Sequence, residues 1–324
     1  RKLKYDWKSH VSTHHHDDHQ VDPPRVEQVA DNVYAYIQPD GTWWINNAGF
    51  IVGNEGVIAI DTCATEKRTR RFLEHVAGIT DQPVRVLVNT HHHGDHTHSN
   101  YLTYPAAIVG HDRCREAVIA SGITSYPGVF GDPAPEWGDL QLAPPMLTFS
   151  DHMHVHTGDL GVELHYIGTP AHTDNDVVAW LPEQRVIFSG DLVFNGGTPF
   201  VLMGSLEGSF TAIERLRAFG ADVIVPGHGP VCDNSVLDRL VSYYEFVRGV
   251  AADAHASGVS PLAAALDTDL GEFAGLSDSE RIVGNLHRAM FELGGAQPGA
   301  AMDLAAAIGD MITFNGGRPL RCLA

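Results

Sequence analysis

Short apolar runs, each bounded by turn residues, recur along the chain from about residue 26 onward. Such runs are typical of β-strands, and Gly53-Asn54-Glu55-Gly56 is typical of the tight turn between two of them. The strands predicted in this way cover residues 33–37, 48–52, 57–60, 84–88, 106–109, 162–167, 177–181, 185–188 and 223–225.

Apolar positions spaced three or four residues apart indicate helices between and after these strands. Thr65 is the predicted start of the first helix, and Gly78 is predicted to end it. Beyond Pro230 the pattern is mainly helical, and Ser277 with Glu280 forms a predicted capping box. The helices are predicted to start near residues 65, 209, 236, 277 and 304.

A long irregular stretch, residues 121–145, lies between the two halves of this pattern. It is rich in Pro and Gly and carries Tyr126, Phe130 and Trp137. A loop of this length is usually functional or disordered, and its aromatic side chains argue against disorder. We therefore expect it to form a wall or lid over an active site.

The first 25 residues are polar and rich in histidine, and they show no apolar periodicity. This pattern predicts a flexible arm over residues 1–25, whose histidines are only a compositional signal for metal binding. Residues 26–324 contain no Gly/Ser linker and are long enough to bury a large core. They are predicted to form one domain that ends in helices.

The chain is acidic, because 21 Lys and Arg face 40 Asp and Glu and give a formal charge of −19. This charge repels phosphate backbones and anionic headgroups, so we expect no nucleic-acid partner and no membrane partner. We find neither an apolar run of transmembrane length nor a secretory signal. Four widely spaced cysteines without a CxxC pair indicate reduced thiols and a cytoplasmic location.

Histidine is in excess, with 20 residues, which directs attention to metal ligands. The segment HHHGDH, residues 91–96, leaves a predicted strand as a loop. In that loop His91 and His93 are expected to point to one side, while Asp95 and His96 turn to a neighbouring position and the middle histidine points away. Neutral imidazoles and a carboxylate are ligands that zinc and iron accept.

Three further candidates follow other predicted strands. His172, Asp191 and His228 each lie just past the C-terminal end of a strand, with Gly or another small residue beside them. Glycine at such a position allows the backbone to turn tightly near an ion. Asp61, which ends the strand at 57–60, is expected to orient a ligand from behind.

The order HxHxDH, then His172, Asp191 and the GHG around His228, resembles the metallo-β-lactamase superfamily over residues 26–324. The resemblance implies an α/β fold, the αββα sandwich of two mixed sheets flanked by helices, which forms the catalytic domain. It also implies two sets of ligands joined by a bridge. The first metal is expected at His91, His93 and His172, the second at Asp95, His96 and His228, with Asp191 bridging both.

Two zinc ions are the cofactors that this resemblance implies, and the same ligands accept iron or manganese. Two cations about 3.5–4 Å apart share a water and lower its pKa toward roughly 7. The expected catalytic group is therefore a metal-bound hydroxide, acting as nucleophile or base beside the ligand Asp95. Many β-lactamases of this fold have cysteine at position 191 or lack a bridging carboxylate, so Asp191 resembles the glyoxalase II-type hydrolases instead.

Four segments resemble a narrower branch, the zinc-dependent aromatic polyketide cyclases of the actinorhodin type. They are residues 43–49, 172–183, 199–205 and 314–324. This resemblance implies aldol ring closure of a small-molecule substrate and its release from an acyl carrier protein, and a homodimer is a further expectation. A flat intermediate suits aromatic walls. The expected substrate-binding residues are Trp43, Trp44, Tyr126, Phe130, Trp137, Phe194, Phe200 and Met203.

Other functions stay open at this point. A generic ester, thioester or lactone hydrolase of the glyoxalase II type fits the same ligands, and an iron-dependent sulfur dioxygenase is the redox alternative. The acidic charge opposes a nuclease, and the complete ligand set opposes a binding protein without activity. His152, His154 and His156 alternate along a strand and are expected to form an exposed polar face rather than a third metal site.

Overall fold

The computed structural model describes residues 22–131 and 134–324. Most of the predicted arm, with all of its histidines, lies outside the described residues. The first strand already begins at Arg25, one residue before the predicted domain boundary.

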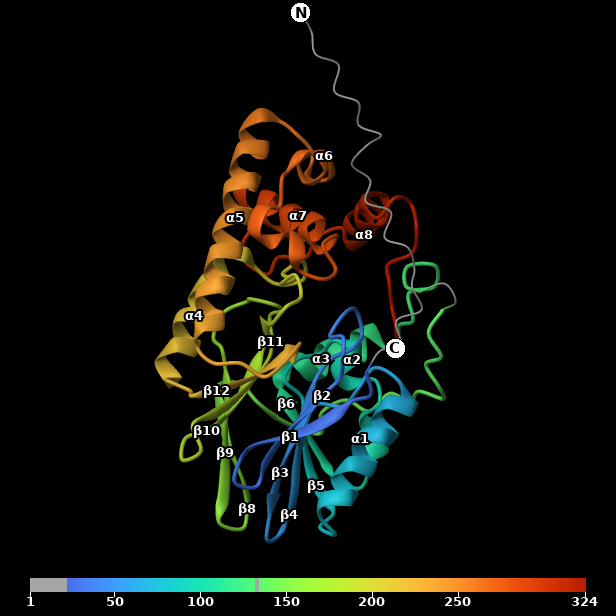
Figure 1. Ribbon diagram of the computed structural model, residues 1–324, viewed down its shortest axis with the longest axis vertical. Helices are drawn as coiled ribbons and strands as arrows, with labels where there is room; N and C mark the ends of the chain where they lie inside the picture. Colours follow the sequence, from blue (N-terminus) through green and yellow to red (C-terminus); the bar gives the residue numbers. More distant parts are fainter. Residues whose placement is uncertain (1–21, 132–133) are drawn as a thin grey trace, which may run out of the picture.

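Two mixed β-sheets form the centre of the molecule (Figure 1). The first sheet has the order β1 (Arg25–Ala30), β2 (Val33–Ile37), β3 (Ala48–Gly53), β4 (Gly56–Ile60), β5 (Val84–Val88), β6 (Ala107–His111) and β7 (Leu147–Phe149). The second has the order β12 (Val223–His228), β11 (Val186–Phe194), β10 (Val177–Leu181), β9 (Leu160–Tyr166) and β8 (His152–Thr157). All the predicted strands are present.

Helices cover the sheets and extend beyond them (Figure 1). They are α1 (Glu66–Ile79), α2 (Gly94–Thr97), α3 (Asp112–Ser121), α4 (Leu206–Phe219), α5 (Ser235–Ser257), α6 (Pro261–Asp267), α7 (Arg281–Leu293) and α8 (Leu304–Phe314). Helix α3 packs on β6 and β7, α4 and α5 pack on β11, and α6, α7 and α8 pack on one another. The predicted sandwich of two mixed sheets flanked by helices is confirmed.

Side chains from both sheets fill the space between them. Ile51, Ile58 and Val88 of the first sheet join the same cluster as Leu164 and Val186 of the second, and all five are fully buried. Burial contributes about 1.5–3 kcal/mol for each such side chain. This core therefore fixes the strands, and with them the positions of the loops that follow the strands.

The helix starts test the local predictions. Thr65 caps α1 as predicted, because its side chain accepts a hydrogen bond from a backbone N–H of the first turn. The capping box of Ser277 and Glu280 is wrong, since α7 begins at Arg281 and Glu280 makes no capping hydrogen bond. The Glu280 carboxylate instead accepts a hydrogen bond from the indole N–H of Trp43, at 2.7 Å. The contact with Trp43, which is distant in the sequence, thus takes the place of the predicted capping contact with Ser277.

Within the described part of the chain, none of the helices has both the length and the apolar character needed to cross a membrane.

Candidate metal centre

Loops and strand ends from both sheets bring the seven predicted ligands together. The first sheet contributes the loop after β5 and the short helix α2, and the second contributes β11, the end of β12 and the loop after β9. These elements carry, in chain order, His91, His93, Asp95, His96, His172, Asp191 and His228.

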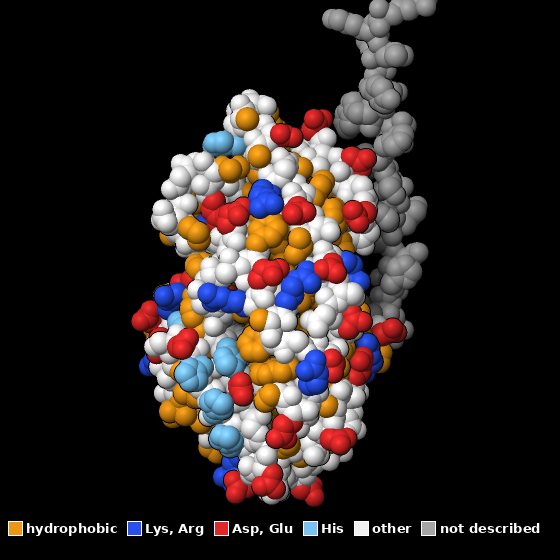
Figure 2. All heavy atoms as spheres, turned by 90° about the vertical axis from the view of Figure 1, so that its left-hand side faces the viewer, with side chains coloured by type: hydrophobic (Ala, Val, Ile, Leu, Met, Phe, Trp, Pro, Cys, Tyr) orange, Lys and Arg blue, Asp and Glu red, His pale blue; other side chains and the backbone are white. Residues whose placement is uncertain are grey.

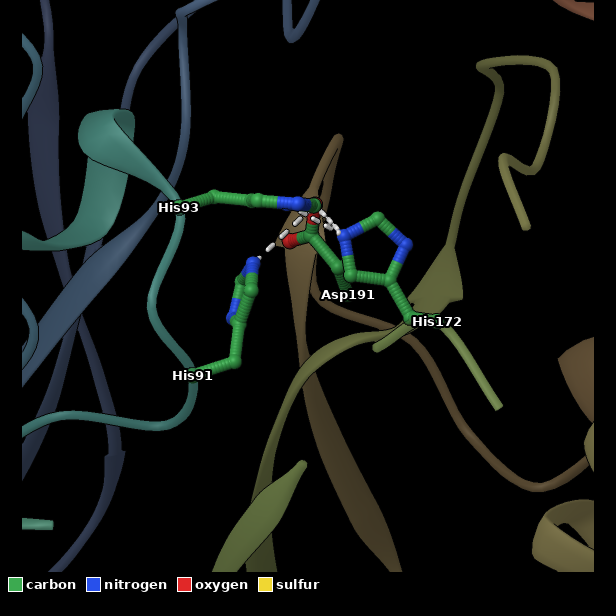
Figure 3. Close-up of side chains that lie close together, drawn as sticks. All are labelled: His91, His93, His172 and Asp191. Atoms are coloured by element: carbon green, nitrogen blue, oxygen red, sulfur yellow. Dashed lines mark hydrogen bonds and ion pairs between the residues drawn. The ribbon is translucent and has the colours of Figure 1, made fainter. Parts of the chain in front are cut away.

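The first group consists of His91, His93, His172 and Asp191, whose ligand atoms all lie within 4.8 Å of one another. Figure 3 shows these side chains pointing toward a common centre. The Nε2 atom of His172 lies 2.8 Å from Nδ1 of His93 and 3.3 Å from Oδ2 of Asp191. Nε2 of His91 lies 4.0 Å from the same oxygen.

The second group consists of Asp95, His96, Asp191 and His228, again within 4.8 Å. Nε2 of His228 lies 3.2 Å from Oδ2 of Asp95 and 3.4 Å from Oδ2 of Asp191. Nε2 of His96 lies 3.0 Å from Oδ1 of Asp191. Asp191 thus belongs to both groups, which is the position that the resemblance implied for a bridging ligand.

Two histidines are oriented through the turn that follows β4. The Nδ1 atom of His96 lies 2.8 Å from Oδ2 of Asp61, and Asp61 also accepts hydrogen bonds from the backbone N–H and the hydroxyl of Thr90. The Thr90 hydroxyl lies 3.1 Å from Nδ1 of His91. A carboxylate behind a ligating histidine fixes its ring and its tautomer, so Asp61 has the orienting position that the sequence predicted.

Two further histidines are oriented by backbone carbonyls. The Nδ1 atom of His172 is 2.6 Å from the carbonyl oxygen of Phe200, and Nδ1 of His228 is 3.1 Å from that of Gly41. A carbonyl only accepts, so each ring must donate through Nδ1 and keeps the lone pair of Nε2 for the centre. These partners set the tautomer that metal ligation needs.

The donor atoms fit metal ions. In residues 22–131 and 134–324, His91 Nε2 is buried without a hydrogen-bond partner, and His96 Nε2 and Asp191 Oδ1 have only their ion-pair contact with each other at 3.0 Å. Each such buried atom costs about 1–3 kcal/mol when unpaired. Imidazole nitrogens with carboxylates are a donor set for zinc, iron and manganese, so a cation in each group would satisfy all three atoms.

The pKa values of the predicted ligands distinguish groups that are ready to bind a metal from imidazoles, those of His96 and His228, that must first lose a proton. Burial lowers the pKa of His91 and of His93 well below the usual value. Burial opposes protonation of His228 as well, but Asp191 and Asp95 raise its pKa to about 9, so a metal ion at Nε2 must displace a proton when it binds. Burial alone would raise the pKa of Asp191, yet His228 and the other imidazoles hold it well below 3.8. The cluster therefore offers ionised carboxylates at neutral pH, as metal binding requires.

A cavity of about 160 Å³ borders both ligand groups, and its walls are mainly apolar. Seven of the eight predicted substrate-binding residues line it, namely Trp43, Trp44, Tyr126, Phe130, Phe194, Phe200 and Met203. Trp137 is not a lining residue, because its ring packs edge-on against Trp44 with the centroids 4.8 Å apart. It supports the wall from outside the cavity.

The irregular stretch 121–145 supplies part of this wall, as predicted. Ser121, Ile123, Tyr126, Phe130 and Leu142 all line the cavity.

The contribution of the C-terminal helices to the cavity was not predicted from the sequence. Arg281, Leu304, Ile308 and Met311 line the cavity from α7 and α8, and the guanidinium of Arg281 lies 4.2 Å from the centre of the Trp43 ring. Amphipathic spacing predicts such helices but not the surface that they will meet.

The histidines of β8 lie away from the cavity. His152, His154 and His156 are exposed on this edge strand, and Figure 2 shows a row of histidines on one face of the molecule. They belong to neither of the two ligand groups found among the described residues. The predicted exposed polar face is confirmed.

Comparison with known proteins places this centre in a family. The sequence profile described as "Metallo-beta-lactamase superfamily" matches residues 41–228, more than half of the chain, and includes all seven ligands. The chain belongs to the metallo-β-lactamase superfamily. Helices α5 to α8 lie beyond the part that this superfamily profile matches.

Three curated relatives illustrate the similarity. A beta-lactamase-like protein 2 homolog of Caenorhabditis elegans is 36% identical over 85 residues, which are 26% of this chain and 28% of the relative. A linear primary-alkylsulfatase of Pseudomonas sp. (strain ATCC 19151) is 25% identical over 226 residues, 58% of this chain and 42% of the relative. A type 2 metallo-beta-lactamase of Bacillus cereus is 25% identical over 191 residues, 57% of this chain and 67% of the relative. The chain thus spans less than half the length of the first two.

A solved metallo-beta-lactamase from Pontibacter korlensis has the same fold. It superposes with a TM-score of 0.57 at 23% identity and covers 68% of this chain and 99% of its own. About a third of this chain therefore has no counterpart in that structure.

Proposed function

We propose that this chain is a two-metal hydrolase that cleaves an ester or thioester next to a flat aromatic acyl group. The observation that carries the proposal is the meeting of two ligand groups with one aromatic cavity. Members of the superfamily are metal-dependent hydrolases, which supports hydrolysis as the reaction type.

The chain's own residues would hold and shield the reacting groups. When bound, two divalent metal ions supply Lewis acidity and a nucleophile at neutral pH. Asp95 lines the cavity, and its side chain is 13% exposed while its Oδ2 atom lies 3.2 Å from His228. This carboxylate therefore faces both the second ligand group and the substrate. The aromatic walls exclude water from the substrate side.

The size of the cavity indicates the size of the acyl group. Its volume of about 160 Å³ is close to that of the roughly 150 Å³ apolar cavity that binds benzene. Phe130 packs tilted against Trp43 and edge-on against Trp44 in its wall, an arrangement that suits a further ring. One aromatic ring would thus be enclosed, and the rest of the substrate would extend outward.

A panel of acyl substrates tests the proposal on the zinc-loaded protein. We expect benzoyl thioesters and esters to be hydrolysed with a kcat/KM at least about 10-fold above that of acetyl analogues. The panel includes an alkyl sulfate and a β-lactam, because proteins with those names are among the relatives. The proposal is wrong if no ester, thioester or lactone is cleaved, or if chelation of the metal leaves cleavage unchanged.

Ring closure is the second candidate, favoured by the aromatic residues of the segment 43–49 at the cavity wall. In that reaction a base removes a proton α to a carbonyl of the substrate, and the resulting enolate attacks a second carbonyl of the same substrate molecule. A polyketone thioester, either free or attached to an acyl carrier protein, would yield a cyclised product that mass spectrometry and NMR identify. Simple hydrolysis of this compound, without a new ring, would rule out the cyclase.

The metal itself separates hydrolysis from sulfur oxidation. The hydrolase is expected to be active with zinc alone. If activity requires iron, disappears with zinc and consumes dioxygen, the sulfur dioxygenase reading replaces it.

A further inference from the structure

Three buried polar side chains share one face of α7. Arg281, Asn285 and Arg288 are 2%, 0% and 1% exposed, and their spacing of four and three residues aligns them along the helix. Side chains of this polarity are rarely buried without a partner. All three find partners in one short segment, residues 198–203, which connects β11 with α4.

The contacts form a continuous row along the backbone of this segment. They are Arg281 Nη1 to Thr198 O at 3.0 Å, Asn285 Nδ2 to Pro199 O at 2.8 Å, Val201 N to Asn285 Oδ1 at 2.9 Å, and Arg288 Nε and Nη2 to Leu202 O at 3.0 and 2.8 Å. Four of the six residues of the segment are thus held by side chains of α7.

The same segment contacts two ligands of the first group. The carbonyl oxygen of Phe200, between two of the clamped residues, accepts a hydrogen bond from Nδ1 of His172 at 2.6 Å. The sulfur of Met203 lies 3.2 Å from Nε2 of His93. The second group has other outer partners, because His96 pairs with Asp61 and His228 with the carbonyl of Gly41.

We infer that α7 is a positioning element of the metal centre. Through residues 198–203 it fixes the carbonyl that orients His172, and it thereby sets the metal affinity of the first ligand group and not of the second. A group one step behind a ligating histidine, as the Phe200 carbonyl is, typically changes metal affinity by about 10- to 100-fold when lost. The α7 side chains act one step further out, through this carbonyl. The inference rests on the two-metal centre of the proposed function and not on its substrate.

Helix α7 lies outside the residues that the superfamily profile matches. The inference therefore assigns to the C-terminal helices a role in metal binding in addition to their role in the cavity wall.

Two variants test the inference. Asn285→Ala removes both hydrogen bonds of Asn285 to the segment. Arg288→Met removes the bonds to Leu202 and the bond to Ala300 without adding a buried charge. It leaves the buried carbonyl of Leu202 unpaired, at a cost to stability of about 1–3 kcal/mol. The metal-free full chain is titrated with Zn²⁺ in competition with a chromogenic chelator. The titration gives the affinity of the chain for each of two zinc ions. His172→Ala and His228→Ala serve as references for the first and the second group.

We expect each α7 variant to lower the affinity for the same zinc ion as His172→Ala does. The expected loss is about 10-fold, the lower end of the range for a direct partner of a ligating histidine. In the same α7 variants, the affinity for the zinc ion that His228→Ala weakens is expected to change by less than about 3-fold. The histidine-rich arm is present in every protein compared, so its contribution cancels.

Val283→Ala is the matched control, because Val283 lies on the same helix, is fully buried in the core and makes no hydrogen bond to residues 198–203. It should lower the melting temperature while leaving both zinc affinities unchanged.

The inference is overturned if the α7 variants leave both zinc affinities at the wild-type value, or if they weaken both equally. A wild-type chain that binds no zinc would overturn the proposed function together with it, whereas a chain that binds two zinc ions but cleaves nothing would leave this inference standing.

Discussion

Four of the predicted ligating histidines contact a residue that lies outside the two ligand groups. Asp61 is the most connected of these, since it accepts hydrogen bonds from Thr90 and faces His96. It also occupies a left-handed backbone conformation, with φ of 57°, at the turn that follows β4. The turn and the orientation of a ligand are therefore determined by one residue.

Replacing Asp61 by Asn tests this role. Asn tolerates the left-handed conformation, so the turn should be kept while the carboxylate behind His96 is lost. We expect kcat/KM and zinc affinity to fall by about 10- to 100-fold, with Asp81→Asn, at an exposed turn, as the control. Unchanged zinc affinity in Asp61→Asn would show that His96 is oriented by other means.

Asp278 leads to a prediction about pH. Burial raises its pKa to about 6, although Arg281 opposes the shift and lies 2.9 Å away. The folded chain therefore holds this proton more tightly than the unfolded chain, whose carboxyl has the ordinary value of 3.8. Its contribution to stability is present below about pH 4 and is lost as the pH rises to about 6.

We expect the free energy of unfolding of the wild type, relative to Asp278→Asn, to decrease over this pH range. Urea unfolding of the metal-free proteins at several pH values measures the difference. A difference that stays constant or grows with pH would contradict the raised pKa.

At the scale of elements, the cavity is closed by segments that are irregular or terminal. The stretch 121–145 is held by the C-terminal segment, because Leu320 exchanges backbone hydrogen bonds with Val129 and Gly131. Phe130 lies between these contacts, is 7% exposed and packs against Trp43 and Trp44. The loop therefore presents an aromatic ring to the substrate from a fixed position.

Phe130→Leu should reduce the preference for aromatic acyl groups. The change keeps an apolar side chain but removes a ring interaction of about 0.5–1.5 kcal/mol, so we expect kcat/KM for a benzoyl thioester to fall about 3- to 10-fold. The value for an acetyl thioester should change little. Phe291→Leu, at an exposed aromatic residue of α7, is the control, and an equal loss for both substrates would contradict the role of the ring.

The sequence alone was sufficient to predict the site residues that directly follow short apolar runs. His172, Asp191 and His228 could be predicted because each follows a short apolar run, and Asp61 because it ends one. The prediction that strands end before Asp191 and His228 is wrong, since β11 and β12 include these residues. Contacts between distant elements were not predictable in this way. The spacing in α7 indicates a helix but not that Asn285 would bind residues 198–203, and an aromatic residue such as Trp137 gives no sign of which side of a wall it will occupy.

For the whole molecule, we expect metal binding to stabilise the folded state. The ligands come from both sheets, so a bound ion joins them and binds the folded state preferentially. A ligand present at 1,000 times its dissociation constant adds about 4 kcal/mol of stability. We expect zinc to raise the melting temperature by several degrees in the wild type and by much less in Asp191→Ala, as followed by circular dichroism. Equal increases in both proteins would mean that the stabilising ions bind elsewhere.

The most direct test of the two-metal centre is a crystal structure of the zinc-loaded protein with anomalous scattering recorded at the zinc edge. We predict two anomalous peaks about 3.5–4 Å apart, one among His91, His93 and His172, the other among Asp95, His96 and His228, with Asp191 between them. A single peak at this place, or peaks confined to the exposed histidines of β8, would contradict the account.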